Sequence, residues 1–205
     1  MQVFILNGRA TVLEPAMAKK VFDNKKIIEP FSLSIHNRVS TGLPKCENEK
    51  WRVFRGLHED GSHINILRNK SIKNIFVMLD THLRGYEKFL SGLTEFGKSA
   101  STVHMSGLGL GTMIPVILSY PNIKELNVVE LSNSLIDLIG PFYESYISEG
   151  RLQIHCADAM EWRPEGNHYD IAFHDIWTSH CKKGNVKILK KYIDFSNRQY
   201  CWYRK

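Results

Sequence analysis

Three glycines stand at alternate positions in one short segment, Ser106-Gly107-Leu-Gly109-Leu-Gly111-Thr. They follow a strand-like run and precede a helix-like run, so the loop can bring backbone N–H groups close to a ligand. The spacing is GxGxG, which differs from the GxGxxG turn that binds pyrophosphate. Taken alone, the glycines fit a ligand-binding loop and a tight structural turn equally well.

Acidic side chains follow each of the next three strand-like runs. Glu130 comes 23 positions after Gly107, where a carboxylate can accept hydrogen bonds from both ribose hydroxyls of a nucleoside. Asp158 and Ala159 follow the run at 152–156 and can face an adenine edge. Asp175 comes at the end of the run at 169–174. Any one of these acids can be a cap or a solvated loop residue. Because parallel strands present ligands at their carboxyl ends, the four features in order predict one nucleoside site.

The segments that carry these residues alternate between strand and helix patterns. This alternation predicts an α/β fold with a Rossmann-like, doubly wound, mostly parallel sheet. Ser132 is the expected N-cap of the second helix, and Val186, Leu189 and Ile193 form the expected apolar face of the third. The expected strands are Thr102–Met105, Leu126–Leu131, Leu152–Cys156, Tyr169–His174 and Gln199–Tyr203, and the expected helices are Thr112–Ser119, Ser132–Ile139 and Gly184–Phe195.

The chain before the glycine turn differs in character from the chain after it. Residues 1–50 are predicted to be an N-terminal extension, weakly structured or with short strands at Val3–Leu6 and Lys26–Ile28. Residues 51–80 predict a small β region with a hairpin. A helix is expected to begin at Asp80 and to end at Gly97, and residues 81–205 form the predicted nucleoside-binding domain.

Composition excludes several classes of protein and locates the charge. Of 205 residues, 43% are hydrophobic and 23% are charged, which rules out whole-chain disorder, collagen and coiled coil. The net charge is +6, but residues 182–205 alone carry eight Lys/Arg against Asp194. That basic segment indicates either a solvated helix face or a nucleic-acid footprint, so nucleic acid is a candidate partner.

No run approaches the ~18 apolar residues that cross a membrane. The first residues lack the basic and apolar regions of a signal peptide, so we expect a cytoplasmic protein with no membrane partner. The four cysteines are Cys46, Cys156, Cys181 and Cys201, and they form no CxxC pair. Their spacing favours free thiols and predicts no metal site.

The run Gly107–Asp175 resembles the fold of class I S-adenosylmethionine-dependent methyltransferases, and within that fold it is most similar to spermidine synthase-like proteins. The likeness lies in four motifs: Gly107-Leu108-Gly109-Leu-Gly111, Val128-Val-Glu130-Leu131, Ala157-Asp158-Ala159 and Tyr169-Asp-Ile-Ala-Phe-His-Asp175. By this resemblance the cofactor is S-adenosylmethionine, its decarboxylated form or methylthioadenosine. The implied cofactor-binding residues are Gly107, Leu108, Gly109, Gly111, Glu130, Leu131, Asp158, Ala159 and Asp175.

Residues 75–205 also resemble small methyltransferase-like proteins encoded by phages, through the GLGLG turn, His174-Asp-Ile-Trp177 and Gln199-Tyr-Cys-Trp-Tyr-Arg204. A phage origin would place the protein in the host cytoplasm. Thr178 replaces the second aspartate of the polyamine-synthase motif, and Met105 replaces an acid found in many methyltransferases. The family's last two strands are not expected, so the sheet would be C-terminally shortened. An uncovered sheet edge favours a homo-oligomer, such as a dimer.

The resemblance implies a transferase that moves a methyl group from S-adenosylmethionine to an unknown acceptor. A spermidine synthase-like aminopropyltransferase is one alternative, and a non-catalytic nucleoside-binding or host-protein-interacting protein is another. Asp175 is the candidate catalytic base. Asp80, His174 and Trp177 are candidate substrate-binding residues, against the plainer interpretations of a helix N-cap, a core histidine and core packing.

Overall fold

The computed structural model describes residues 2–6, 9–13, 38–39, 43–57, 63–72, 76–79, 87–96, 99–164, 166, 168–176 and 182–201. The chain divides into two compact units. One comprises Met1–Arg84 with Leu110–Ser119, and the other comprises Gly85–Gly109 with Tyr120–Lys205. Each unit is described in its own right below.

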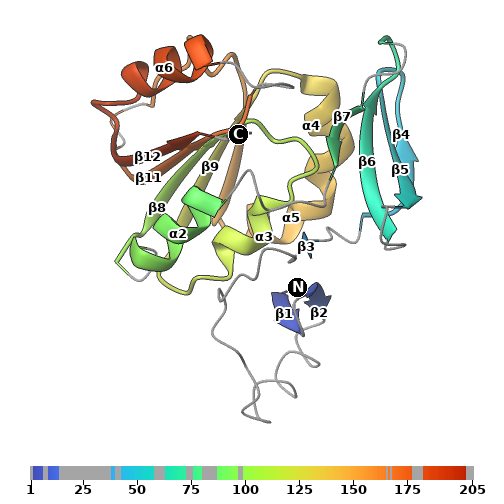
Figure 1. Ribbon diagram of the computed structural model, residues 1–205, viewed down its shortest axis with the longest axis horizontal. Helices are drawn as coiled ribbons and strands as arrows, with labels where there is room; N and C mark the ends of the chain where they lie inside the picture. The colour runs from blue at the N-terminus through green and yellow to red at the C-terminus, as the bar shows by residue number, and fades with distance from the viewer. Residues whose placement is uncertain are drawn as a thin grey trace. The chain divides into compact units, whose positions relative to one another are not determined.

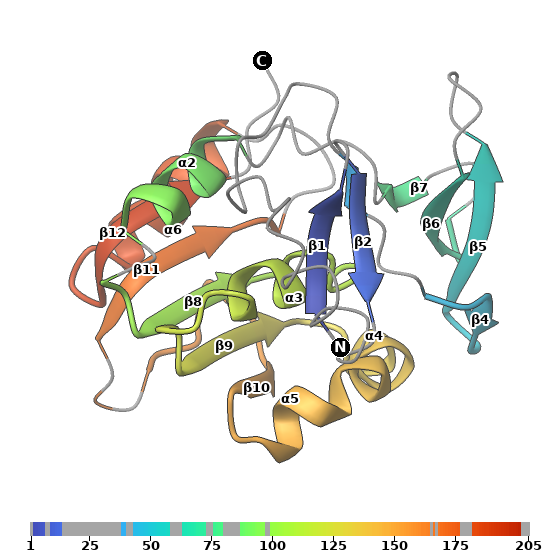
Figure 2. The same cartoon turned by 90° about the horizontal axis from the view of Figure 1, so that it is seen from below.

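The second unit is built on a five-stranded sheet whose strands all run in the same direction. Its order is β10-β9-β8-β11-β12, so the connections reverse direction between β8 and β11 (Figure 2). This arrangement is Rossmann-like and confirms the predicted fold class. The strands are β8 (Thr102–Ser106), β9 (Glu125–Glu130), β10 (Leu152–Cys156), β11 (Tyr169–His174) and β12 (Ser196–Cys201).

Helices cover this sheet on both faces (Figure 1). One face is apolar: Ile154, Val128, Met105, Phe173 and Tyr200 lie in one row across the five strands. That row borders α2, whose Gly92 meets the Tyr200 ring, and η2, whose Gly140 borders Ile154. The helices on this side are α2 (Glu87–Phe96), α4 (Asn133–Ile139), η2 (Gly140–Tyr143) and α5 (Glu144–Ser148).

The opposite face is polar, although it is buried. His104 and Ser106 of β8, Asn127 of β9 and His174 of β11 point to it, and each is at most 2% exposed. Helix α6 (Lys182–Lys191) lies over this face, and Tyr192, directly after it, is completely buried. Buried polar side chains require hydrogen-bond partners, so this face must carry an internal network.

The inward side of α6 differs from the sequence prediction. Val186 and Ile193 were expected to face the core, but they are 47% and 65% exposed. Instead Asn185 and Ile188 are buried, as is Tyr192 one turn later. The inward side of α6 is therefore mixed, since it carries the polar Asn185 and the aliphatic Ile188 and is followed by the phenol of Tyr192.

Among its described residues, the first unit contains two small sheets and one helix. The three-stranded sheet consists of β1 (Gln2–Leu6), β2 (Arg9–Leu13) and β3 (Arg38–Val39). The antiparallel sheet consists of β4 (Cys46–Glu47), β5 (Trp51–Leu57), β6 (His63–Asn69) and β7 (Phe76–Leu79), which confirms the predicted hairpin. Helix α3 (Met113–Leu118) follows the glycine turn in sequence. The expected strand at Lys26–Ile28 lies outside the described residues.

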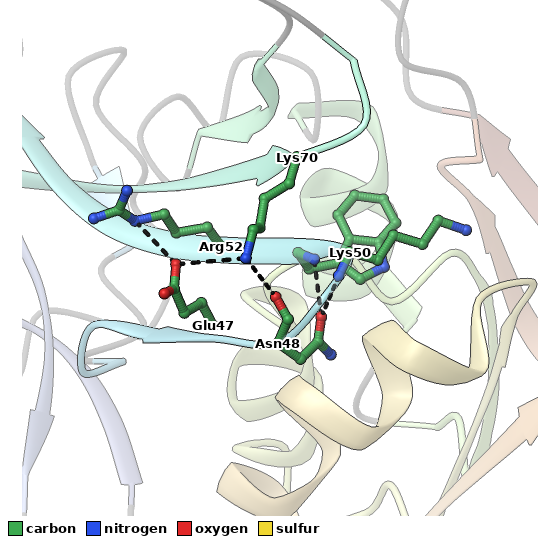
Figure 3. A network of polar contacts seen from close by, with 6 residues as sticks. Glu47, Asn48, Lys50, Arg52 and Lys70 are labelled. Carbon is green, nitrogen blue, oxygen red and sulfur yellow. Dashed lines mark hydrogen bonds and ion pairs between the residues drawn. The ribbon is translucent and has the colours of Figure 1, made fainter.

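A polar network fixes the turn between β4 and β5 (Figure 3). Oδ1 of Asn48 accepts hydrogen bonds from the backbone N–H groups of Lys50 and Trp51 at 3.0 and 2.9 Å. Nζ of Lys70 donates to the carbonyl oxygen of Asn48 at 3.0 Å, and Glu47 pairs with Arg52 at 3.4 Å. The Lys70 and Glu47–Arg52 contacts are exposed, so they define the turn more than they stabilise the unit. Within the described part of the chain, no helix is long and apolar enough to cross a membrane.

Candidate functional site

The carboxyl ends of β10, β9, β8 and β11 form one edge of the parallel sheet, and Gly107 lies near its middle. The backbone N–H of Gly107 donates to the carbonyl oxygen of Val129 at 2.8 Å. On the other side, the N–H of Asp175 donates to the carbonyl oxygen of Ser106 at 2.8 Å. The structure therefore brings the glycine turn, the end of β9 and Asp175 together.

Gly107 is required at this point for two reasons. Its φ is +96°, a backbone conformation that residues with a Cβ avoid. A Cβ placed here would also collide with the carbonyl oxygen of Asp175. Gly109 and Gly111 have φ of 52° and 67°, so the whole turn uses conformations suited to glycine.

Glu130 connects the ends of β9 and β8 through its side chain. One carboxylate oxygen, Oε2, accepts a hydrogen bond from the backbone N–H of Leu108 at 2.9 Å. The other, Oε1, accepts one from the backbone N–H of Ser132 at 2.9 Å. Two N–H donors thus fix the carboxylate, and each oxygen keeps a further lone pair for another donor.

Neighbouring groups differ sharply in exposure. Leu131 is 70% exposed directly after Glu130, whereas Leu108 is 2% exposed and offers its backbone rather than its side chain. Ser132 takes the N-cap position of α4 as expected, but its hydroxyl makes no cap hydrogen bond and instead contacts the Ser134 hydroxyl at 3.1 Å.

Asp158 lies beyond the end of β10, beside Glu130, since the N–H of Ala157 donates to the carbonyl oxygen of Glu130 at 3.0 Å. Asp158 is exposed, and its Oδ1 accepts a hydrogen bond from the N–H of Met160 at 2.8 Å, which closes a local turn. Ala159 is 4% exposed, and its carbonyl oxygen accepts a hydrogen bond from the Tyr192 hydroxyl at 3.2 Å.

Asp175 is half-buried at the end of β11. Its charge reaches Cys201 of the adjacent strand. Burial, together with the negative charge of Asp175, raises the pKa of the Cys201 thiol to about 12. Asp175 therefore occupies the boundary between the protein interior and the open edge of the sheet.

His174 lies beneath this edge rather than on it. Only 1% of its surface is exposed, and both ring nitrogens make hydrogen bonds inside the protein. Burial lowers its pKa to about 4, which the hydrogen bond with Gln199 partly opposes. The expected substrate residues Asp80 and Trp177 lie outside the described residues.

Sequence reasoning missed the residues that surround His174. His104, Ser106, Tyr192 and Gln199 lie beside it and were assigned no role. The available signal was the alternation Thr102, His104, Ser106 along one strand, because a period of two places all three side chains on the same face. Among the residues that the structure describes, no group of three or more His, Cys, Asp or Glu side chains is placed to hold a metal ion.

No protein-family model matches this sequence, and no curated protein matches it. Among solved structures, it is similar to the methyltransferase domain of bacterial CtHen1-CN, at 15% identity, a TM-score of 0.44 and coverage of 56% of this chain and 61% of that chain. It is also similar to the CcbJ methyltransferase from Streptomyces caelestis, at 14% identity and a TM-score of 0.42, covering 56% of this chain and 44% of the other.

A spermidine synthase in complex with the transition state analogue AdoDATO is similar at 13% identity and a TM-score of 0.49. That match covers 75% of this chain and 54% of the synthase. The chain thus spans less than two thirds of the length of each of these three structures. The Rossmann-like assignment rests on the order and direction of the strands in the sheet and not on these similarities.

Proposed function

We propose that the parallel-sheet unit binds a nucleoside of the S-adenosylmethionine type at the carboxyl edge of its sheet. The observation that supports this most is the Glu130 carboxylate, which backbone N–H groups fix beside the glycine turn. Its remaining lone pairs suit the two hydroxyls of a ribose. The exposed side chain of Leu131 adds an apolar surface for a base next to that acid.

The other residues of the site take roles that follow from their positions. Gly107 and Gly109 allow close approach of the ligand to the backbone, and Gly111 completes the turn. Asp158 and Ala159 contact the adenine edge. Asp175, at the end of β11, is the proposed base that accepts a proton from an acceptor.

The proposed activity is transfer of a methyl group to an unknown acceptor. A sulfonium cofactor supplies an activated methyl group, so the protein contributes orientation more than acid–base chemistry. The acceptor atom forms a bond to the methyl carbon as the sulfur–carbon bond breaks, and Asp175 takes the proton that the acceptor loses. Asp80 and Trp177 remain proposed parts of the acceptor pocket.

Two alternatives share the same nucleoside site. Aminopropyl transfer uses the decarboxylated cofactor and a cationic diamine, which carboxylates would hold. Thr178 stands where a second carboxylate would serve this purpose, which argues against that activity. A protein that binds the nucleoside without catalysis, and contacts a host protein, is the other alternative.

Calorimetric titration of the full chain separates these functions. S-adenosylhomocysteine, S-adenosylmethionine, its decarboxylated form and methylthioadenosine are titrated in turn. Failure of all four to bind would contradict the nucleoside site. Preference for the decarboxylated form would favour aminopropyl transfer, and binding without turnover of an acceptor panel would favour the non-catalytic alternative.

Two variants locate the site and its chemistry. Glu130→Ala should abolish binding, while Glu125→Ala, at the other end of the same strand, should not. Asp175→Asn should retain binding and lose transfer. Full activity of Asp175→Asn would show that another group accepts the proton.

We also propose that α6 binds nucleic acid through exposed lysines. Lys183, Lys187 and Lys190 recur at helical spacing, so they share one outward face. Replacing all three by Gln should reduce the slope of log affinity against log salt by about 2 to 3 for a DNA duplex. Gln at the exposed Lys45, Lys50 and Lys124 serves as the matched control. An unchanged slope would indicate a solvated helix face.

A homo-oligomer remains part of the proposal. In the described chain, each of the edge strands β10 and β12 pairs with a single neighbouring strand of the sheet. Such edges have unpaired backbone groups that a second copy can pair with. Light scattering at several concentrations tests this, and a monomer at every concentration would contradict it.

A further inference from the structure

Three buried side chains and the half-buried Gln199 form a continuous hydrogen-bonded chain directly beneath the glycine turn. Ser106 Oγ lies 2.9 Å from His104 Nε2 and 2.9 Å from His174 Nδ1. His174 Nε2 lies 3.3 Å from Oε1 of Gln199. The chain crosses three neighbouring strands, β8, β11 and β12, and Ser106 is its centre.

Aromatic rings enclose this chain on the side of α6. The rings of His104 and Trp162 stack at 5.3 Å between centroids, and those of His104 and Tyr192 at 4.7 Å. Tyr169 packs against His104 at 5.2 Å. Because His104 and Ser106 are completely buried, water does not compete for their hydrogen bonds.

Several charged and titratable groups lie around these side chains in the described part of the protein. His155 and Lys191 act on His104 electrostatically, and burial together with the nearby His174, His155 and Lys191 lowers its pKa well below the usual value. Tyr192 hydrogen-bonds with the Ser106 side chain and is also acted on by Tyr169 and Asp158, and Asp175 acts on Cys201. Both histidines are therefore neutral at pH 7, and each has one N–H and one bare nitrogen.

The hydrogen-bond partners determine the order of the protons. Oε1 of Gln199 accepts only, so His174 donates from Nε2 and its Nδ1 accepts the Ser106 hydroxyl proton. Ser106 Oγ then accepts from His104 Nε2–H. Nδ1 of His104, which has no partner among the described residues, is left as a bare acceptor. The reverse order would leave a buried N–H donor without a partner, which folded proteins avoid more strictly.

Ser106 also fixes the neighbouring strand through its backbone, because its carbonyl oxygen accepts the N–H of Asp175 at 2.8 Å. The next residue is Gly107, whose missing Cβ leaves room for the Asp175 carbonyl. The hydroxyl and the carbonyl of one serine thus hold β8 and β11 together at the point where both strands enter the site.

We propose that Ser106 is a positioning residue of the nucleoside site, which sets Gly107 and Asp175 relative to each other through the hydroxyl that contacts His104, His174 and Tyr192. The proposal rests on the function proposed above. Ser106 makes no contact with the ligand itself. It acts through the two strand ends, and the two histidines fix the direction of its hydroxyl.

A matched control exists at the other end of the same strand. The hydroxyl of Thr102 also connects β8 to β11, lying 3.2 Å from Oδ2 of Asp170, and it accepts the Asp170 N–H at 3.2 Å. Ser106→Ala and Thr102→Ala therefore each remove one inter-strand hydroxyl from one face of β8. Only the first removal is at the ligand edge.

The first measurement is calorimetric titration of S-adenosylhomocysteine into folded wild type, Ser106→Ala, Ser106→Thr and Thr102→Ala. We expect Ser106→Ala to bind roughly tenfold more weakly, as the loss of one buried hydrogen-bonded connection would give. Thr102→Ala should bind as wild type does, and Ser106→Thr should recover most of the affinity. Equal losses in Ser106→Ala and Thr102→Ala would overturn the positioning role, because both would then be structural.

The outcomes separate this proposal from the function on which it rests. If the wild type binds and Ser106→Ala binds equally well, only the positioning role fails. If the wild type binds none of the four nucleosides, the proposed function fails and the positioning role fails with it.

The second measurement needs no ligand. ¹⁵N NMR of the histidine rings at pH 7 should show both His104 and His174 protonated at Nε2, and Ser106→Ala should alter both ring environments while leaving exposed His168 unchanged. Protonation of His174 at Nδ1 would overturn the proposed hydrogen-bond order.

Discussion

Acid should unfold this protein partly through His174. In the unfolded chain a histidine titrates near pH 6.5, but burial lowers the pKa of His174 to about 4 in the folded protein. Between these two pH values the unfolded chain binds one more proton than the folded chain, so the free energy of unfolding falls as the pH falls. The pKa difference corresponds to a loss of about 3 kcal/mol, which develops below pH 6.5 and is complete near pH 4.

The assay is urea denaturation of the wild type and His174→Asn at pH values from about 4.5 to 7.5, followed by circular dichroism. The free energy of unfolding should depend on pH less steeply in the variant, by about 1.4 kcal/mol per pH unit. Carboxylates are common to both proteins, so their contribution cancels in the comparison. His168→Asn, at an exposed position, is the control for exchanging a histidine for an asparagine. Equal slopes in wild type and His174→Asn would refute the reasoning.

Three further predictions test the packing around the sheet. Gly107→Ala should reduce the free energy of unfolding in urea denaturation by at least the roughly 1–2 kcal/mol that its φ of +96° costs, because a Cβ would also collide with the Asp175 carbonyl; wild-type stability would show that the turn adapts. Gly92→Ala should reduce the free energy of unfolding by about 1–3 kcal/mol, since a Cβ would collide with the Tyr200 ring. This change should lower the midpoint temperature of thermal unfolding, and an unchanged midpoint would show that the ring moves freely. Iodoacetamide at pH 7.5 should alkylate the exposed Cys156 before Cys201, whose pKa burial raises to about 12, and mass spectrometry showing the reverse order would contradict that assignment.

The sheet was predictable because its strands are short, mostly apolar runs bounded by turn signals. β10 and β11 have the predicted bounds, and β9 is displaced by a single residue. Local sequence determines such elements, since a buried parallel strand must be apolar over most of its length. The β–α alternation predicted a doubly wound, mostly parallel sheet, because right-handed crossovers leave few other arrangements, but the order of the strands was not predicted.

The polar face of the sheet could not be predicted in the same way. A histidine within an apolar run is ambiguous, because its burial depends on partners that come from other strands. His174 obtains these partners from Ser106, 68 positions earlier, and Gln199, 25 positions later. The exposure of Val186 on α6 was equally hard to predict, because the helix buries Asn185 and Ile188 instead and is followed by the buried Tyr192. The two-residue repeat of a strand and the 3.6-residue repeat of a helix predict neither the burial of His174 nor the exposure of Val186.

Glu130 shows how a structural role and a binding role can belong to the same side chain. The sequence indicated an acid for ribose but not the backbone N–H groups of Leu108 and Ser132 that fix it. A carboxylate offers about four lone-pair sites, and these two donors use one on each oxygen, so both oxygens can still accept a hydroxyl. A side-chain amide in its place would point its NH2 group at one of the two backbone N–H groups, and two donors cannot form a hydrogen bond. Glutamine at position 130 would therefore disturb the turn as well as the ligand contact, so the requirement for an acid here follows from the fold before any ligand binds.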